Sequence, residues 1–202
     1  MSTRLSAQDL EQIHTGIRDK YAKVAVSPEG QFTYPTGRTG LERLQYDAAL
    51  VADLPETVAG SYCGVGNPFS LGEIKPGSRV LDIGCGAGVD ALVASMVVGP
   101  SGKVMGIDIT PEMIRRAEAN KKETGVENVV FQLDRVQDLT GIDASFDVVM
   151  SNGALNLMPE KEEVLSAAFR LLKPGGRLFI ADQFLVAPIS KDINARIKSW
   201  FQ

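Results

Sequence analysis

The sequence predicts a three-layer α/β sandwich built around a mainly parallel sheet. From residue 78 onward, short apolar runs alternate with segments of helical periodicity, and turns rich in glycine and proline separate them. The expected strands are 79–83, 103–107, 129–133, 146–151 and 177–181. Because strands that alternate with helices form βαβ units, we expect any ligand to bind beyond the carboxyl ends of the strands.

The helices between these strands carry their own start and stop signals. We expect helices over residues 89–98, 110–124 and 161–172. The clearest start is Thr110 followed by Pro111, which predicts a hydroxyl N-cap and then a proline at the first helical position, where its missing N–H costs nothing. Gly125 ends that helix, and the Lys-Pro-Gly-Gly sequence of residues 173–176 closes the last one.

Residues 1–70 are expected to form a helical and loop cover, and residues 71–202 the main domain. Ser6 and Asp9 resemble a capping box, and apolar residues then recur at helical spacing, which predicts an amphipathic helix over about residues 7–23. A short helical piece is expected over residues 40–50. This segment holds all four tyrosines, and such a segment can close over a pocket and exclude water. His14, the single histidine, is expected to have a surface or packing role.

Composition narrows the class of partner. The chain has 202 residues, a formal net charge of −4 and a pI of about 5.1, so no basic face for nucleic acid is visible and a small-molecule substrate is favoured. The amino-terminal segment lacks the apolar core of a signal peptide, and the longest apolar stretch, residues 91–98, is too short to span a membrane. Two cysteines without metal-ligand spacing indicate neither a metal site nor a disulfide scaffold. We therefore expect a cytoplasmic protein without a membrane partner.

The sequence VLDIGCGAG, residues 80–88, places three glycines directly between a strand and a helix. Gly84, Gly86 and Gly88 permit a tight turn and a close approach of the backbone to a ligand, and Cys85 within the turn needs only to be small. A related turn, G-x-G-x-x-G, binds dinucleotides, but its last glycine is Val89 here. A nicotinamide-dependent oxidoreductase is therefore the less favoured alternative.

Two carboxylates indicate the ligand more directly. Asp82 just before the turn would face a dinucleotide's pyrophosphate unfavourably, whereas S-adenosylmethionine has no phosphate and carries a sulfonium and an ammonium group. Asp108, at the end of the second predicted strand, can accept hydrogen bonds from both ribose hydroxyls, with Ile109 against the adenine face. The turn and the two carboxylates predict a site for S-adenosylmethionine.

With the segments GIDIT, SFDVVMSN and LLKPGGRLFIAD, this pattern resembles the class I S-adenosylmethionine-dependent methyltransferases, which have a Rossmann-like fold. Within that class it is most similar to the arsenite methyltransferase group. The group-specific matches are GNP at residues 66–68, DITPEM at residues 108–113 and SN-x-x-x-NL at residues 151–157. The resemblance covers about residues 60–185.

The resemblance implies a role for each matching residue. Asp82, Gly84, Gly86 and Gly88 would hold the methionine part of the cofactor, and Asp108 its ribose, with Ile109 and Met113 nearby. The backbone N–H of Val136 would contact adenine. Asn152 would position the methionine end, and the loop of residues 151–157 would border the transferred methyl group.

The sequence departs from this group at two places. Related enzymes often carry an acidic residue before the Val136 position, where this chain has Arg135, with Asp134 one step earlier. Arsenite methyltransferases bind arsenic through several cysteines, two of which correspond to Val65 and Gly153 here, and one thiolate cannot complete a three-coordinate site. Most of the group's cysteines are therefore missing.

The sequence identifies no convincing catalytic base, which favours a soft or already ionised nucleophile. The candidates for contact with the acceptor are Asn152, Asp182 and Cys63. The predicted function is transfer of a methyl group from S-adenosylmethionine to a small molecule, arsenite-like or another soft nucleophile. The main alternative is a regulator that holds S-adenosylhomocysteine without turnover.

The predicted sheet stops early for this class. Members normally add a helix and a hairpin after the fifth strand, whereas this chain ends within an apparent helix that begins near Lys191. An uncovered sheet edge is unfavourable. We therefore expect either a truncated chain or a homodimer that covers the open edge.

Overall fold

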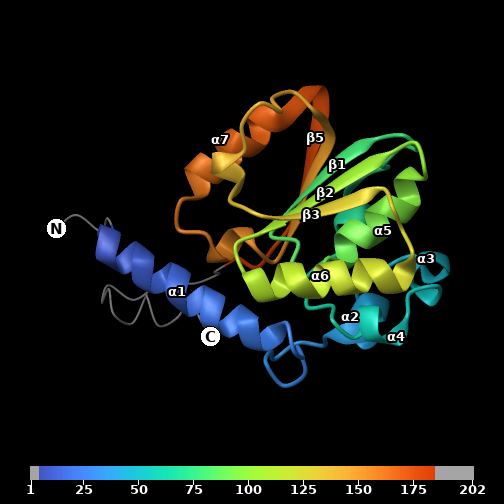
Figure 1. The fold of residues 1–202 in the computed structure, drawn as a ribbon, viewed down its shortest axis with the longest axis horizontal. Coiled ribbons are helices and arrows are strands. Elements are labelled where there is room, and N and C mark those ends of the chain that lie inside the picture. Colours follow the sequence, from blue (N-terminus) through green and yellow to red (C-terminus); the bar gives the residue numbers. More distant parts are fainter. Residues whose placement is uncertain (1–4, 185–202) are drawn as a thin grey trace.

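The computed structural model describes residues 5–184, which contain a five-stranded parallel sheet in the order β3-β2-β1-β4-β5 (Figure 1). The strands are β1 (Arg79–Ile83), β2 (Lys103–Asp108), β3 (Val129–Leu133), β4 (Phe146–Asn152) and β5 (Leu172–Ala181). The predicted α/β fold is confirmed. The strand order reverses between β1 and β4, and a crevice at such a reversal is the usual ligand site of an open parallel sheet.

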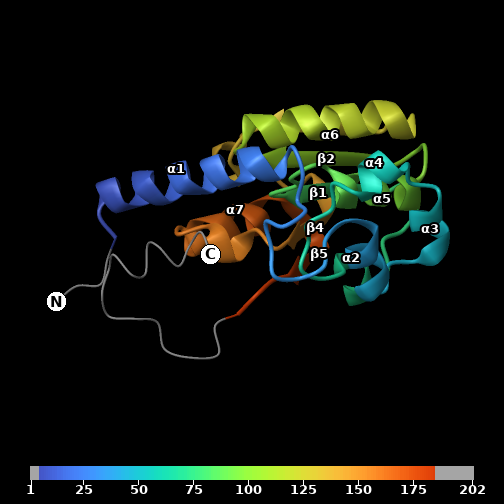
Figure 2. The ribbon, with the colours of Figure 1, turned by 90° about the horizontal axis from the view of Figure 1, so that it is seen from below.

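Both faces of the sheet are covered. The helices α5 (Val89–Val98) and α6 (Pro111–Thr124) lie on one face and α7 (Lys161–Leu171) on the other (Figure 2). In β1, Val80 packs toward α5 while its neighbour Leu81 packs toward α7, as the alternation of side chains along a strand requires. Covering both faces explains why the strands are continuous apolar runs.

The amino-terminal cover contains α1 (Ala7–Val24), α2 (Gly37–Arg43), α3 (Ala48–Ala52), α4 (Glu56–Ala59) and the 3-10 turn η1 (Pro68–Leu71). The capping box of Ser6 and Asp9 forms as predicted. The single helical piece expected over residues 40–50 is wrong, because Gln45 adopts a φ of 57° and separates two short helices. The short helix α4 was not predicted.

The cover and the sheet share one apolar core. Leu41 and Val58 belong to the same buried cluster as Val80 and Val89, so α2, α3 and α4 are part of the packed body. The proposed division at residue 70 stays a prediction. Among the residues that the structure describes, no helix is long and apolar enough to cross a membrane.

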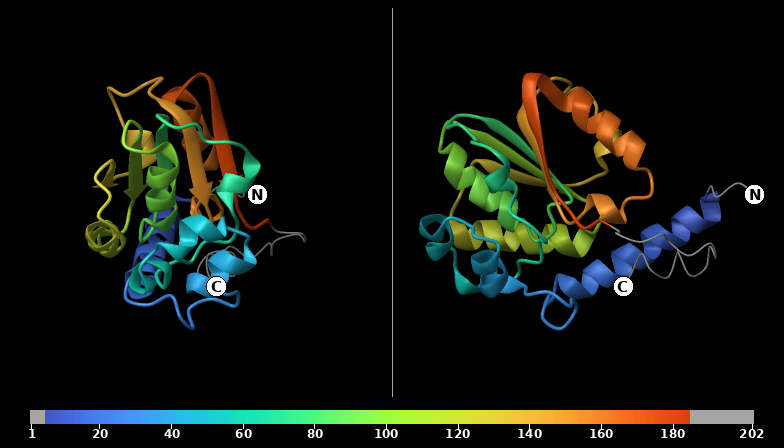
Figure 3. Two further views of the ribbon diagram at one scale, coloured as in Figure 1. Left: turned by 90° about the vertical axis from the view of Figure 1, so that its right-hand side faces the viewer. Right: turned by 180° about the vertical axis from the view of Figure 1, so that it is seen from behind.

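The helix α1 is attached differently. Its buried residues Ile13 and Ile17 pack against Ile109 and Leu157, which lie at the carboxyl ends of the strands. Figures 2 and 3 show its amino-terminal half extending away from the sheet. The helix therefore borders the expected ligand crevice, and near its carboxyl-terminal end Val24 packs against Met113 of α6.

The edge strand β5 begins earlier than the predicted residue 177. Phe146 pairs with Leu172, and after a register shift Val148 pairs with Arg177, so the Lys-Pro-Gly-Gly segment forms an irregular part of the strand. A sequence pattern for a turn cannot distinguish a loop from such an irregularity. The helix expected near Lys191 lies outside the described residues, and the homodimer at this edge stays a prediction.

Substitution of Gly88 by alanine should destabilise the protein by about 2–4 kcal/mol, because Gly88 has a φ of 81° and an added Cβ would lie 2.5 Å from Phe131 Cζ. Gly125→Ala is the matched control: its φ is 69°, but an added Cβ meets nothing within 4 Å, so about 1 kcal/mol should be lost. Urea unfolding of the two variants measures both values. Equal losses would contradict the packing role of Gly88.

Candidate functional site

A cavity of about 1080 Å³, counting its opening to solvent, lies at the carboxyl ends of β1, β2 and β4. Most of the predicted site residues line it, namely Cys63, Asp82, Gly84, Cys85, Gly86, Asp108, Ile109, Asp134, Arg135, Val136 and Asn152. The α1 residues His14, Ile17 and Tyr21 form part of its wall.

The glycine turn forms the floor of the cavity and is held by β2. The amides of Gly84 and Cys85 both donate to the Ile107 carbonyl at 2.9 Å. Gly84 has a φ of 72°, and an added Cβ would lie 2.4 Å from the Cβ of Ala154. Glycine at this position thus allows the turn to approach the loop after β4 closely.

Two predicted cofactor residues lie outside the cavity wall. Gly88 allows α5 to pack closely against Phe131, and Met113 is fully buried behind the turn with Val24 and Ala87. The cofactor roles expected for Gly88 and Met113 stay predictions. A glycine in a turn indicates that another group approaches the backbone closely, but the sequence does not show whether that group is a ligand or a protein side chain.

Three buried carboxylates surround the turn: Asp82, Asp90 and Asp108. Burial raises the pKa of all three, that of Asp90 to about 6, and the negative charges of Asp90 and Asp108 raise the pKa of Asp82 further. Asp82 is 2% exposed, and its Oδ2 is buried without a hydrogen-bond partner among the described residues. Such a cluster is unfavourable unless a cation neutralises it, so its chemistry fits a sulfonium or ammonium group.

Asp90 was missed in the sequence. It is the only charged residue in the otherwise apolar helix α5, and it is 8% exposed at the wall of the cavity. A single carboxylate within a buried helix was the signal that could have identified it, because charged residues are rarely buried without a function or a partner.

Asp108 holds the loop around it with both oxygens. Its Oδ2 accepts from Gly86 N at 2.9 Å, and its Oδ1 accepts from Thr110 N at 2.8 Å. The predicted N-cap hydrogen bond of the Thr110 hydroxyl to α6 is absent, so that detail is wrong. Each carboxylate oxygen retains capacity for another donor, which is compatible with the predicted contact to ribose.

Asn152 joins β4 to the cover. Its Oδ1 accepts from the amides of Val65 and Gly66 at 2.9 and 3.0 Å, and its Nδ2 donates to Asp90 Oδ2 at 2.9 Å and to the Gly66 carbonyl at 2.8 Å. An added Cβ on Gly64 would lie 2.3 Å from this Nδ2. Because the protein occupies its polar atoms, the geometry supports a positioning role for Asn152 rather than direct contact with an acceptor.

Tyr46 and Tyr62 complete this polar network. The Tyr46 hydroxyl donates to Asp90 Oδ1 at 2.6 Å, and the Tyr62 hydroxyl donates to the Gly66 carbonyl at 2.9 Å. Burial and the nearby Asp90 raise the pKa of both phenols. They are therefore protonated donors at neutral pH, and they fix the loop of residues 62–66 against the cavity.

The two cysteines are free and differ in position. Cys63 lines the cavity, and burial together with Asp108 and Asp90 raises the pKa of its thiol to about 12. Cys85 is buried in the turn, and burial raises its pKa as well. In the part of the chain that the structure describes, no three or more His, Cys, Asp or Glu side chains are grouped to hold a metal ion.

Asp182, the third candidate for contact with the acceptor, lies outside the cavity wall. Its Oδ2 accepts from Asn156 N at 2.9 Å and its Oδ1 accepts from Gln183 N at 2.7 Å. Burial raises the pKa of this carboxyl. The side chain stabilises the loop after β4, and its predicted contact with the acceptor stays a prediction.

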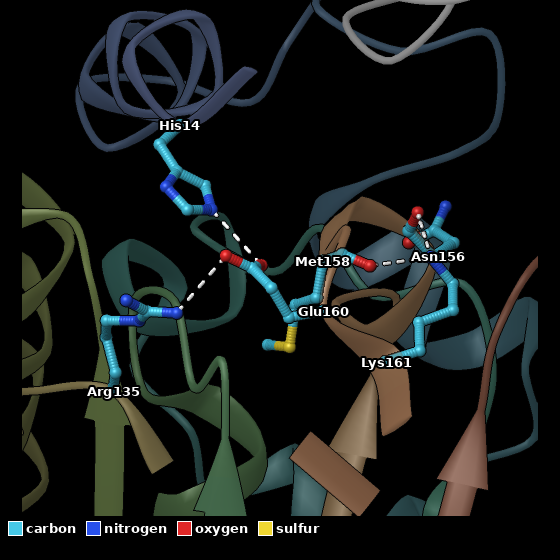
Figure 4. A network of polar contacts seen from close by, with 6 residues as sticks. All are labelled: His14, Arg135, Asn156, Met158, Glu160 and Lys161. Carbon is cyan, nitrogen blue, oxygen red and sulfur yellow. Dashed lines mark hydrogen bonds and ion pairs between the residues drawn. The ribbon is translucent and has the colours of Figure 1, made fainter. Parts of the chain in front are cut away.

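Charged and polar side chains from three segments meet where they line the cavity (Figure 4). Glu160 Oε2 lies 3.3 Å from His14 Nε2 of α1, and Glu160 Oε1 lies 3.3 Å from Arg135 Nη2. The surface or packing role expected for His14 is too narrow, because its ring lines the cavity. Glu160 carried no sequence signal, since an acidic residue at a helix start is ordinary.

Asp82→Asn should stabilise the ligand-free protein at pH 8 by about 1–3 kcal/mol, because it removes a buried charge. The native pKa is raised above 3.8, so the carboxyl favours folding less as pH rises above about 4. The gain of the variant should therefore grow with pH and vanish below pH 4. Unfolding at several pH values measures it.

The control for this experiment is Asp19→Asn, an exposed carboxylate on α1, which should change the unfolding free energy little at any pH. A loss of stability in Asp82→Asn at pH 8 would contradict the assignment of an uncompensated buried charge.

Comparison with known proteins agrees with this geometry. The family described as "Methyltransferase domain" matches residues 74–202. The arsenite methyltransferase of Halobacterium salinarum is 38% identical over 206 residues, covering 95% of this chain and 52% of the relative. The arsenite methyltransferase of Mus musculus is 30% identical over 204 residues, covering 96% and 54%.

A solved structure of a methyltransferase also resembles this chain. The arsenic(III) S-adenosylmethionine methyltransferase of Chlamydomonas reinhardtii superposes with a TM-score of 0.61 at 36% identity, covering 74% of this chain and 50% of that one. The chain thus spans about half the length of these relatives. From its fold, its cavity and these matches, the chain belongs to the class I S-adenosylmethionine-dependent methyltransferases.

Proposed function

We propose that this protein binds S-adenosylmethionine in the cavity and transfers its methyl group to a small soft nucleophile. The observation that carries the proposal is the cluster of Asp82, Asp90 and Asp108, in which Asp82 Oδ2 is buried without a hydrogen-bond partner among the described residues. A cationic cofactor satisfies this cluster, whereas the pyrophosphate of a nicotinamide cofactor would be repelled by it.

Different residues of the chain would contact different parts of the cofactor. Asp82 and Asp90 offer negative charge to the ammonium group of the methionine part, and Asp108 offers acceptors to the ribose. Ile109 and Val136 line the cavity beside Asp108 and suit the adenine ring. When bound, S-adenosylmethionine supplies an electrophilic methyl group on a sulfonium, so the protein's task is binding and alignment.

We propose a soft nucleophile because the groups that lie beside the glycine turn on the cover side are poor bases. The groups beside the glycine turn on the cover side are Tyr62 and Cys63, whose raised pKa values keep them protonated at neutral pH. Asp90 already accepts hydrogen bonds from Tyr46 and Asn152. A thiol or arsenic(III) needs little proton removal, and the curated relatives named above are arsenite methyltransferases.

The thiols that would bind arsenic are few. The positions Val65 and Gly153, where the resembling group carries cysteines, lie side by side, since a Cβ added to Gly153 would be 3.2 Å from Val65 Cγ1. This leaves Cys63 as the cysteine beside the cavity that can serve an arsenic-like acceptor. We propose a cytoplasmic setting, which agrees with two free thiols.

The competing function is a regulator that holds S-adenosylhomocysteine without turnover. Its supporting observation is that Asn152 is fully engaged in hydrogen bonds, so this residue is not available to an acceptor. Incubation with methyl-labelled donor and candidate acceptors decides between the two, because a regulator would transfer label to none of them.

The protein should bind S-adenosylmethionine and leave NAD unbound, and its affinity for the cationic cofactor should fall as pH drops below about 6. Asp90 has a pKa of about 6, and protonation removes a charge that attracts the cation. The loss should reach about tenfold between pH 8 and pH 5. Calorimetric titration at these pH values measures it, and tight NAD binding or a pH-independent affinity would contradict the proposal.

Cys63→Ser should lower methyl transfer to arsenite by at least about tenfold, because it removes the soft ligand at the cavity wall. Transfer to a small thiol, measured with the same variant and the same labelled donor, should change less than about threefold and serves as the matched control. Equal loss with both acceptors would assign Cys63 to packing instead.

A further inference from the structure

Glu160 occupies the N-cap position of α7 but does not cap that helix. Its side chain makes no hydrogen bond to the first turn of α7. It is instead 17% exposed and lines the cavity. Figure 4 shows its carboxylate directed toward His14 and Arg135, away from its own helix. The carboxylate is therefore directed to the cavity and not to its own helix.

Part of the cavity that Glu160 lines is apolar, and this part, here called the slot, suits a flat base. Ile109, Val136, Leu157 and Met158 are apolar residues that line the same cavity. Ile109 follows Asp108 directly, so the slot begins beside the carboxylate that we assign to ribose. A ligand whose ribose contacts Asp108 would thus direct its base between these side chains toward Glu160.

Glu160 also has capacity for a further donor. Its contacts to His14 and Arg135 are both 3.3 Å long, and a carboxylate can accept about four hydrogen bonds. The neighbouring carboxylate of Asp134 is used differently, because its oxygens accept from Arg135 N at 2.8 Å and from Gln132 Nε2 at 2.8 Å. Asp134 thus holds its own segment, whereas the Glu160 carboxylate contacts side chains of two other segments.

The loop that carries Glu160 is held from two sides. Lys161 Nζ donates to the carbonyl of Asn156 at 3.2 Å and to that of Met158 at 2.6 Å (Figure 4). Asp182 accepts from the amide of Asn156 at 2.9 Å. A recognition group gains selectivity when its backbone cannot shift to accommodate another ligand, and this loop meets that condition.

We propose that Glu160 is a specificity-determining residue whose carboxylate accepts a hydrogen bond from the 6-amino group of the cofactor's adenine, so that the site rejects a 6-oxopurine. The inference rests on the proposed function, because it requires the nucleoside part of the cofactor to lie in this cavity. His14 and Arg135 act as positioning residues that hold the carboxylate in place.

The test compares the dissociation constants of S-adenosylhomocysteine and S-inosylhomocysteine, which carries oxygen in place of the 6-amino group. The wild-type protein should prefer the adenosyl compound by about tenfold or more, because a carboxylate cannot donate to a 6-oxo group. Glu160→Gln should reduce the preference below about threefold, since an amide can donate to oxygen. Glu163→Gln, an exposed acid in the first turn of α7, should keep the wild-type preference.

Additional variants separate recognition from folding. Glu160→Asp retains a carboxylate and should keep the direction of the preference even if both affinities fall. His14→Gln and Arg135→Gln should lower the preference for the adenosyl compound, because the Glu160 carboxylate is then held less firmly. An unchanged preference in Glu160→Gln, or no preference in the wild type, would overturn the inference while leaving the proposed function standing. Failure of the wild type to bind either compound would refute the proposed function itself.

Discussion

The structure is organised around negative charge buried at the point where the strand order reverses. Asp82, Asp90 and Asp108 come from β1, α5 and β2; burial raises the pKa of all three, and the charges of Asp90 and Asp108 raise that of Asp82 further. The fold accepts this cost because backbone amides, a phenol and Asn152 compensate part of it. The negative charge that is not compensated lowers the stability of the ligand-free protein, and it would attract a cationic ligand.

The cover depends on the same charge. Tyr46 and Asn152 both contact Asp90, and Asn152 in turn binds the loop of residues 62–66. This network ties the cover to β4 and places Cys63 at the cavity wall. The helix α1 reaches the cavity independently, through Ile13 and Ile17 and through the contact between His14 and Glu160. The network around Asp90 thus holds the loop of residues 62–66 at the cavity wall, and the contacts of α1 place that helix at another part of the cavity.

Most of the fold was predictable because its signals are local. The strands β1 to β4 are apolar runs bounded by polar or turn-forming residues, and α6 follows its N-cap Thr110 and ends before Gly125 as the pattern indicates. Asp82 and Asp108 were identified because they stand at strand ends beside a glycine turn. The errors, at Gln45 and at the start of β5, occur where backbone conformation or strand pairing overrides a composition pattern.

The sequence by itself determined the α/β class, the glycine turn and the two carboxylates that indicate the cofactor. The tertiary structure alone showed the contacts that join Asp90 to Asn152 and His14 to Glu160. The physical reason is distance along the chain: Asp90 meets Asn152 across 62 positions, and His14 meets Glu160 across 146. No local periodicity encodes such a contact, because only the packing of the cover onto the sheet brings these side chains together.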